Sequence, residues 1–290
     1  MHKAGFVSIV GKPNVGKSTL MNRLVGENLS IISHKAQTTR HRIMGILNGD
    51  DFQVVYSDTP GILEPKYALH EAMMNYVKVS LEDADAVLLV VEYGERFDES
   101  IYNRFKSLTA PVLLLINKVD KAPKAERQSV IDYWKTHLAA KEIIPVSALT
   151  GENVEKVFPA LLNLLPEHPA YFPKDDFTNR SERFFASEMI REKIFQNYNQ
   201  EIPYSTEVGI EDFKDEESII RIRATIFVER DSQKGILIGK AGSSLKKVGT
   251  EARQDMEKFF GKKIFLETRV KVAADWRKQK DKLRNFGYLE

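Results

Sequence analysis

The chain has 290 residues, of which 42% are hydrophobic and 29% are charged, and it contains no cysteine. This length suits two domains of roughly 100 to 200 residues each, and the apolar content excludes a chain that is disordered throughout. No apolar run approaches the ~18 residues that cross a bilayer, and the absence of cysteine excludes disulfides and thiolate metal sites. The first residues lead into a strand pattern without the apolar core of a signal peptide, so we expect a cytoplasmic protein.

The formal net charge of +2 hides a strong asymmetry along the chain. Residues 233–290 carry 15 Lys and Arg against 7 Asp and Glu, whereas residues 171–232 carry 9 against 14. Such an asymmetry indicates that the C-terminal part meets a polyanion, either nucleic acid or an anionic membrane surface. The alternative is a solvated basic face without a ligand.

Short β-rich runs alternate with longer helical patterns through the first part of the chain, which is typical of βαβ units. The expected strands are residues 6–10, 42–47, 52–56, 86–91, 112–116 and 143–146. The turn at residues 48–51 predicts a hairpin between the second and third strands, and hence one antiparallel edge. We therefore predict an α/β domain over residues 1–165, with a mostly parallel sheet and helices on both faces.

Three prolines, Pro166, Pro169 and Pro173, interrupt both periodicities and indicate a linker over residues 166–178. Residues 179–290 then show a different pattern, which predicts an α+β domain with a basic C-terminal tail. Its expected elements are a helix to about residue 199, strands over 204–214 and 218–229, a helix over 232–238, a turn over 239–242, a helix over 243–260 and a strand over 263–273.

A phosphate-binding loop follows the first expected strand and precedes a helix. Its residues are Gly11, Lys12, Pro13, Asn14, Val15, Gly16, Lys17 and Ser18, followed by Thr19. They fit the pattern G-x-x-x-x-G-K-[ST], in which backbone N–H groups and the helix N-terminus face the phosphates. Lys17 would contact the β- and γ-phosphates, and Ser18 would ligate Mg²⁺.

A second motif stands at the end of the strand over 52–56, where a carboxylate can hold the magnesium shell. It consists of Asp58, Thr59, Pro60 and Gly61. Asp58 would bind Mg²⁺ through water, and Gly61 can turn its N–H toward a γ-phosphate.

A third motif, at the end of the strand over 112–116, would recognise the base of a bound nucleotide. It consists of Asn117, Lys118, Val119 and Asp120. The Asp120 carboxylate can accept from guanine N1–H and the 2-amino group, whereas adenine would leave it unpaired. Asn117 would tie this loop to the phosphate loop, and the Lys118 stem would cover the base. Backbone N–H groups of Ser147, Ala148 and Leu149 could meet guanine O6.

In their order along the chain these motifs resemble those of the translation-factor-related GTPases. The resemblance implies GTP, GDP and Mg²⁺ as ligands, and a switch threonine in the segment Gln37-Thr38-Thr39-Arg40. We assign Mg²⁺ ligation to Thr39, with Thr38 as the alternative. Ile62 stands where Ras-like GTPases carry the glutamine that orients water, so we expect slow hydrolysis. In the related subgroup an asparagine at the place of Asn14 accompanies a K⁺ ion, which makes K⁺ stimulation a hypothesis here.

The second domain contains a G-x-x-G turn that could approach a nucleic-acid backbone closely. The expected RNA-binding residues are Ile238, Gly239, Lys240, Ala241, Gly242, Lys246 and Lys247. KH modules clamp about four single-stranded nucleotides with such a loop. A structural helical hairpin with solvated lysines is the alternative.

The element order α-β-β-α-α-β is that of a KH type II fold, and the whole chain resembles the Era family of GTPases. The resemblance rests on the phosphate loop, residues 35–40, residues 186–193, residues 201–205 and residues 238–242. It implies a monomeric GTPase that binds the 3′ end of 16S rRNA through its KH domain and assists maturation of the 30S ribosomal subunit.

Two other functions are considered beside this one. A membrane-associated signalling GTPase would use the basic segment 276–284 for peripheral contact with the inner face of the cell membrane. A GTPase of the tRNA-modification group would share the switch sequence but lacks a C-terminal G-x-x-G module.

Overall fold

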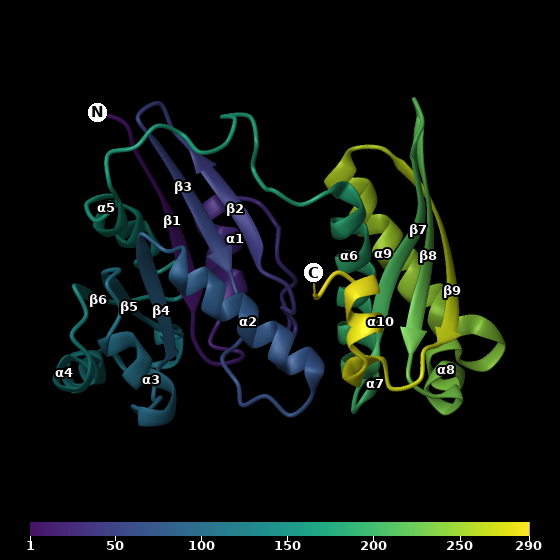
Figure 1. The fold of residues 1–290 in the computed structure, drawn as a ribbon, viewed down its shortest axis with the longest axis horizontal. Helices are drawn as coiled ribbons and strands as arrows, with labels where there is room; N and C mark the ends of the chain where they lie inside the picture. The colour runs from purple at the N-terminus through teal and green to yellow at the C-terminus, as the bar shows by residue number, and fades with distance from the viewer. Residues whose placement is uncertain (290) are drawn as a thin grey trace. The chain divides into compact units, whose positions relative to one another are not determined.

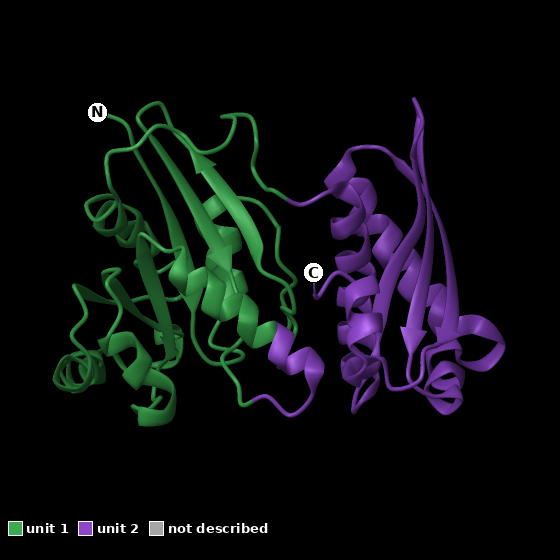
Figure 2. Ribbon diagram, viewed as in Figure 1, with its two compact units in different colours: residues 1–64, 73–179 green, residues 65–72, 180–290 purple. Residues whose placement is uncertain are grey.

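The computed structural model describes residues 1–289, which form two compact units (Figure 2). Unit 1 comprises Met1–Glu64 and Met73–Asn179, and unit 2 comprises Pro65–Ala72 and the residues from Arg180 onward. Among the described residues, no helix combines the length and apolar character needed to cross a membrane.

Unit 1 is built on a six-stranded sheet with the strand order β2-β3-β1-β4-β5-β6 (Figure 1). The strands are β1 Lys3–Val10, β2 Ile43–Asn48, β3 Phe52–Asp58, β4 Ala86–Glu92, β5 Val112–Asn117 and β6 Glu142–Pro145. Only β2 runs antiparallel to its neighbour within this sheet, which confirms the predicted hairpin edge. The carboxyl ends of the parallel strands therefore meet at one edge of the sheet, where ligands bind in α/β folds.

Helices cover both faces of this sheet, as predicted. They are α1 Lys17–Val25, α2 Ala68–Glu82, α3 Glu99–Lys106, α4 Arg127–His137 and α5 Val157–Leu162, with short 3-10 turns at Val119–Lys121, Lys124–Glu126 and Val154–Lys156. Side chains of α2, α3 and α4 share one core with β4 and β5, and this core includes the fully buried Trp134. On the other face, α1 packs over Gly45 of β2, and Phe158 of α5 packs on Phe52 of β3.

The segment expected as a linker, residues 166–178, packs on unit 1 along β2 and β3. The buried Gln53 side chain accepts from Tyr171 N and Phe172 N at 2.7 and 3.0 Å and donates to Phe172 O at 2.8 Å. Thr178 donates to Met44 O at 2.7 Å. Ile46 N also donates to Phe177 O at 2.9 Å, so the segment satisfies backbone groups of β2, the open edge of the sheet. The segment therefore belongs to the body of unit 1 rather than to a free tether.

Unit 2 pairs β7 with β8 antiparallel and β8 with β9 parallel, and its order of main elements is the predicted α-β-β-α-α-β (Figure 1). The helices and strands are α6 Glu182–Asn197, α7 Ile202–Ser205, β7 Glu207–Asp215, β8 Ile219–Val228, α8 Asp231–Ile238, α9 Ser243–Phe260, β9 Lys263–Val272 and α10 Lys280–Asn285, with 3-10 turns at Lys240–Gly242 and Trp276–Lys278. Apolar residues of α6, α8 and α9 form one core with the sheet.

One local expectation for unit 2 was wrong. The strand expected from residue 204 begins at Glu207, because Pro203 in the first turn of α7 favours a short helix there. On the neighbouring strand β8, Thr225 is fully buried. Its hydroxyl donates to Glu211 and accepts from Arg269, and these two side chains cover it.

The segment expected as a basic tail folds back onto unit 2. Trp276 and Leu283 are fully buried, and Tyr288 is nearly so. Trp276 Nε1 donates to Ser205 O at 2.8 Å, and the Tyr288 hydroxyl donates to Glu207 Oε2 at 2.5 Å. Burial of these aromatic rings outweighs the charge of the neighbouring lysines, which stay at the surface.

Candidate functional site

The phosphate loop connects β1 to α1 and leaves no room for side chains at two of its glycines. A Cβ on Gly11 would lie 2.1 Å from Val90 O, and one on Gly16 would lie 2.2 Å from Asn117 Nδ2. Gly16 also has a φ of +99°, in the left-handed region. The loop therefore packs directly against β4 and the base-binding loop, with its N–H groups at the start of a helix that favours anions.

Lys17 is buried beneath this loop. Its ammonium group donates to Gly11 O at 3.1 Å and Lys12 O at 2.9 Å. Burial lowers the pKa of Lys17 to about 8, although Asp58 and Glu95 oppose the shift by attracting the charge. A cation held in this way is positioned for phosphate oxygens, which would restore its full charge.

Three oxygens converge beside Lys17, as a magnesium site requires. Ser18 Oγ lies 2.9 Å from Thr39 Oγ1 and donates to Asp58 Oδ2 at 2.6 Å. The second carboxylate oxygen, Asp58 Oδ1, is buried without a hydrogen-bond partner, and burial raises the pKa of Asp58. Hard oxygen ligands around a carboxylate that has one oxygen without a hydrogen-bond partner fit Mg²⁺.

The two candidate switch threonines differ in their contacts. Thr39 lies beside Ser18 and 3.4 Å from Asp58 Oδ2. Thr38 instead donates its hydroxyl proton to Lys35 O at 2.7 Å. The arrangement therefore offers Thr39, rather than Thr38, to a metal ion held by Ser18.

The segment after Asp58 is pressed against the phosphate loop. A Cβ on Gly61 would lie 2.6 Å from Pro13 Cα, and Ile62 N donates to Gly11 O at 3.0 Å. The Ile62 side chain is buried in the core with β4 and β5, and the Thr59 hydroxyl donates to Ile9 O at 2.8 Å. Neither of these two side chains is available to orient water.

Asn117 and Asp120 are held in place by the neighbouring loops. Asn117 Nδ2 donates to Val15 O at 2.7 Å, and Asn117 Oδ1 accepts from Ala148 N at 2.8 Å. Ser147 Oγ donates to Asp120 Oδ1 at 2.6 Å. Lys118 Nζ pairs with Glu92 Oε2 at 2.7 Å, which extends its stem along the site. The geometry thus presents an oriented carboxylate, as recognition of guanine requires.

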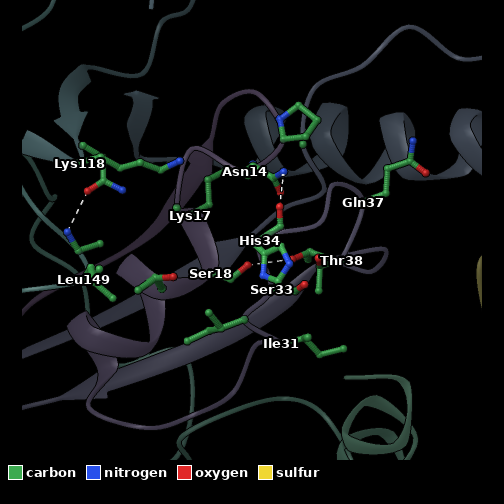
Figure 3. A pocket seen from close by; sticks show the side chains of 18 of the residues that line it. Asn14, Lys17, Ser18, Ile31, Ser33, His34, Gln37, Thr38, Lys118 and Leu149 are labelled. Atoms are coloured by element: carbon green, nitrogen blue, oxygen red, sulfur yellow. Dashed lines mark hydrogen bonds between the residues drawn. The ribbon is translucent and has the colours of Figure 1, made fainter. Parts of the chain in front are cut away.

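A cavity of about 260 Å³ joins the phosphate loop, the switch threonines and the base-binding loops (Figure 3). Of the predicted residues, Pro13, Asn14, Gly16, Lys17, Ser18, Thr19, Thr38, Thr39, Gly61, Asn117, Lys118, Asp120, Ala148 and Leu149 line it. The other predicted residues do not line it: Gly11, Lys12, Val15, Asp58, Thr59, Pro60, Ile62 and Ser147.

Several lining residues were not predicted. They are Ile31, Ile32, Ser33, His34 and Lys121, and Gln37 was named only as part of the switch segment. Most precede the switch threonines in a stretch without a repeating pattern, and its position between α1 and Thr39 was the available signal. The predicted Asn14 also touches this stretch, because its Nδ2 donates to His34 O at 2.9 Å (Figure 3).

The G-x-x-G turn of unit 2 lies between α8 and α9. Gly239 and Gly242 have φ values of +72° and +76°, and Ala241 between them has a φ of +51°. A Cβ on Gly239 would lie 2.2 Å from Ser244 Oγ, so this position requires glycine. Lys240 and Ala241 are exposed, and the tight turn gives a ligand backbone close access.

The other basic residues near this turn differ in exposure and in how closely they pair with acidic side chains. Lys246 and Lys247 are exposed on the first turns of α9, and Lys247 lies 3.8 Å from Glu251. Arg253 is paired with Glu257 at 2.7 Å, and Lys262 is paired with Asp215 at 2.7 Å. The exposed positive charge therefore gathers at the turn and the start of α9.

These features define a P-loop GTPase domain followed by a KH domain. Residues 6–118 match the family model described as "50S ribosome-binding GTPase", and residues 201–277 match the family model described as "KH domain". The chain is 48% identical to the GTPase Era of Syntrophus aciditrophicus (strain SB), in an alignment that covers 100% of this chain and 96% of the relative.

Two solved structures have the same fold over the whole chain. An Aquifex aeolicus Era variant bound to GDP and AlF4⁻ superposes with a TM-score of 0.96 at 42% identity, covering 99% of this chain and 100% of that one. Era in complex with MgGDPNP and nucleotides 1506–1542 of 16S ribosomal RNA superposes with a TM-score of 0.96 at 41% identity, covering 100% of both. The chain belongs to the Era family of GTPases.

Proposed function

We propose that unit 1 binds GTP and Mg²⁺ with the residues placed above, and that its nucleotide state controls binding of RNA by the KH domain. The RNA is the 3′ end of 16S rRNA, so the protein acts on the 30S subunit during its assembly. The observation that carries the proposal is the convergence of Ser18, Thr39 and Asp58 beside Lys17, which joins the switch segment to the phosphate site.

Each residue of the nucleotide site has a role that follows from its contacts. Lys17 binds the β- and γ-phosphates, Ser18 and Thr39 ligate Mg²⁺, and the Asp58 carboxylate orders the metal's water shell. Bound Mg²⁺ would neutralise phosphate charge that develops during hydrolysis. The backbone N–H of Gly61 binds the γ-phosphate, so loss of that phosphate frees both switch segments.

The base site selects guanine through complementary hydrogen bonds. Asp120 accepts from N1–H and the 2-amino group, Asn117 holds the loop against the phosphate loop, and the 147–149 turn donates to O6.

Because Ile62 stands in place of the glutamine that orients water, hydrolysis in this site needs another water-positioning or charge-stabilising group. We propose K⁺, because Asn14 is exposed beside the phosphate loop and its Nδ2 is occupied by His34 O, which leaves Oδ1 as a cation ligand. GTP turnover should be faster in K⁺ than in Na⁺ at equal ionic strength, with GDP affinity as the control. Equal turnover in both salts would contradict this role.

RNA binding is assigned to the turn at residues 238–242 together with Lys246 and Lys247. A Lys240→Ser variant should weaken binding of an oligonucleotide from the 3′ end of 16S rRNA and lower its salt dependence. GTP hydrolysis without RNA should be unchanged. A Lys214→Ser variant, on the distant strand β7, is the matched control. Equal RNA affinity in wild type and Lys240→Ser would contradict the assignment.

The proposed location is the cytoplasm, with a monomeric protein. Peripheral membrane contact through residues 276–284 is disfavoured, because Trp276 and Leu283 are buried in unit 2 and present no apolar face to lipid. Sedimentation with anionic vesicles that persists at high salt would reverse this preference.

A further inference from the structure

Arg23, in the last turn of α1, reaches the loop that follows β6. Its Nε donates to Ala148 O at 2.8 Å, and its Nη2 donates to Leu149 O at 2.7 Å. Arg23 does not line the nucleotide cavity, whereas Ala148 and Leu149 do. The arginine therefore contacts the base site only through two backbone carbonyls and does not line the cavity itself.

The loop is shaped to receive this side chain. Gly151 has a φ of +92°, and a Cβ at this position would lie 2.6 Å from Arg23 Nη1. Within the loop, Thr150 N donates to Ser147 Oγ at 3.1 Å and Gly151 N donates to Ser147 O at 2.8 Å. A planar guanidinium with donors in a fixed fork suits two successive carbonyls, which a single ammonium cannot satisfy equally.

Fixing the Ala148 carbonyl also fixes the next N–H. In a trans peptide the carbonyl and the N–H point in opposite directions, and the described chain contains no cis peptide. Because Arg23 holds Ala148 O, the Leu149 N–H of the same peptide is turned away from Arg23. Ala148 N is already engaged by Asn117 Oδ1, so Leu149 N–H is the donor left for the base.

We propose that Arg23 is a positioning residue for guanine specificity, which holds the 148–149 peptide so that Leu149 N–H faces guanine O6. The inference rests on the guanine site proposed above. A flipped peptide would present Ala148 O instead, which repels guanine O6 and accepts from the 6-amino group of adenine. Arg23 thereby favours guanine over adenine without touching either base.

The loop does not depend on Arg23 alone for its fold. From the other side, Arg127 Nη1 donates to Glu152 Oε1 at 2.6 Å and Arg127 Nη2 donates to Val119 O at 2.8 Å. Since this second arginine ties the loop to the base-binding turn, an Arg23→Met variant should keep its fold. Arg104→Met, at an exposed position on α3, is the matched control.

The test compares GDP with two altered bases at mildly acidic pH. The nucleotide 6-thio-GDP keeps N1–H and the 2-amino group but replaces O6 with a weak acceptor, and IDP keeps O6 but lacks the 2-amino group. In Arg23→Met we expect GDP affinity to fall about fivefold and 6-thio-GDP affinity to fall less than about twofold. The ratio of GDP to IDP affinity should stay constant, and Arg23→Lys should restore part of the loss.

Any other outcome contradicts either the inference about Arg23 or the guanine site on which it rests. Equal losses for GDP and 6-thio-GDP, or no loss, would show that Arg23 has only a structural role and overturn the inference. A wild type that prefers GDP to IDP but not to 6-thio-GDP would also overturn it, because O6 would then not be read. A wild type that prefers GDP to neither would contradict the guanine site itself.

Discussion

Raising the pH from 7 toward 9 should weaken GDP binding through Lys17. Burial lowers the pKa of this group to about 8 in the free site, whereas the phosphates of bound GDP require its charged form. The charged form is present below pH 8 and is lost above it. At about pH 9 roughly nine-tenths of the free protein would carry neutral Lys17, so the dissociation constant rises about tenfold. A lysine with its ordinary pKa would change the affinity very little over this range.

Titration calorimetry in two buffers of different ionisation enthalpy measures this effect twice, as affinity and as protons taken up on binding. Near pH 9, GDP binding should take up close to one proton. The guanine N1 proton also begins to titrate there, and GMP, which has the same base but no β-phosphate, corrects for it. If GDP and GMP lose affinity equally and no extra proton is taken up, the account of Lys17 is wrong.

Three further predictions concern single substitutions. Asp120→Asn should lower GDP affinity on the order of 10²-fold. The variant should instead favour xanthosine diphosphate, because the 2-oxygen of that base accepts from the new amide. Unchanged base preference in competition binding would contradict this prediction. Gly61→Ala should slow GTP hydrolysis on the order of 10²-fold, because the added Cβ meets the Pro13 backbone. GDP affinity, measured in the same preparation, should stay within about threefold of the wild-type value. Normal turnover would contradict the role of this contact. Trp276→Phe should cost about 1–3 kcal/mol of unfolding free energy, since Ser205 O loses its donor, and an unchanged denaturant midpoint would show that the bond is dispensable.

Many of the residues that line the nucleotide cavity could be predicted because they belong to short motifs at strand ends. Strand periodicity located the β1, β3 and β5 ends, and parallel pairing brings those ends to one sheet edge. The choice between Thr38 and Thr39 could not be made in this way. It depends on which hydroxyl the backbone turns toward Ser18, and in the structure Thr39 lies beside Ser18 whereas Thr38 donates to Lys35 O.

Long-range packing explains the features that the sequence concealed. Prolines and charges at residues 166–178 suggested a linker, yet one buried amide, that of Gln53, holds two successive backbone N–H groups of this segment. The charged C-terminal segment suggested a tail, but its few aromatic residues find partners in α7 and β7 that are far away in the sequence. Arg23 belongs to none of the sequence motifs, and its partners lie 125 and 126 residues further along the chain.

The most direct test of the account is binding of the full chain to a short single-stranded RNA copying the 3′ end of 16S rRNA. Affinity would be measured with a nonhydrolysable GTP analogue, with GDP and without nucleotide, at two salt concentrations and against a scrambled RNA. We predict tighter and sequence-selective binding with the GTP analogue, because only a ligand that prefers one state can shift the equilibrium. Equal, nonselective and strongly salt-dependent binding in all three states would contradict nucleotide control of a specific RNA site.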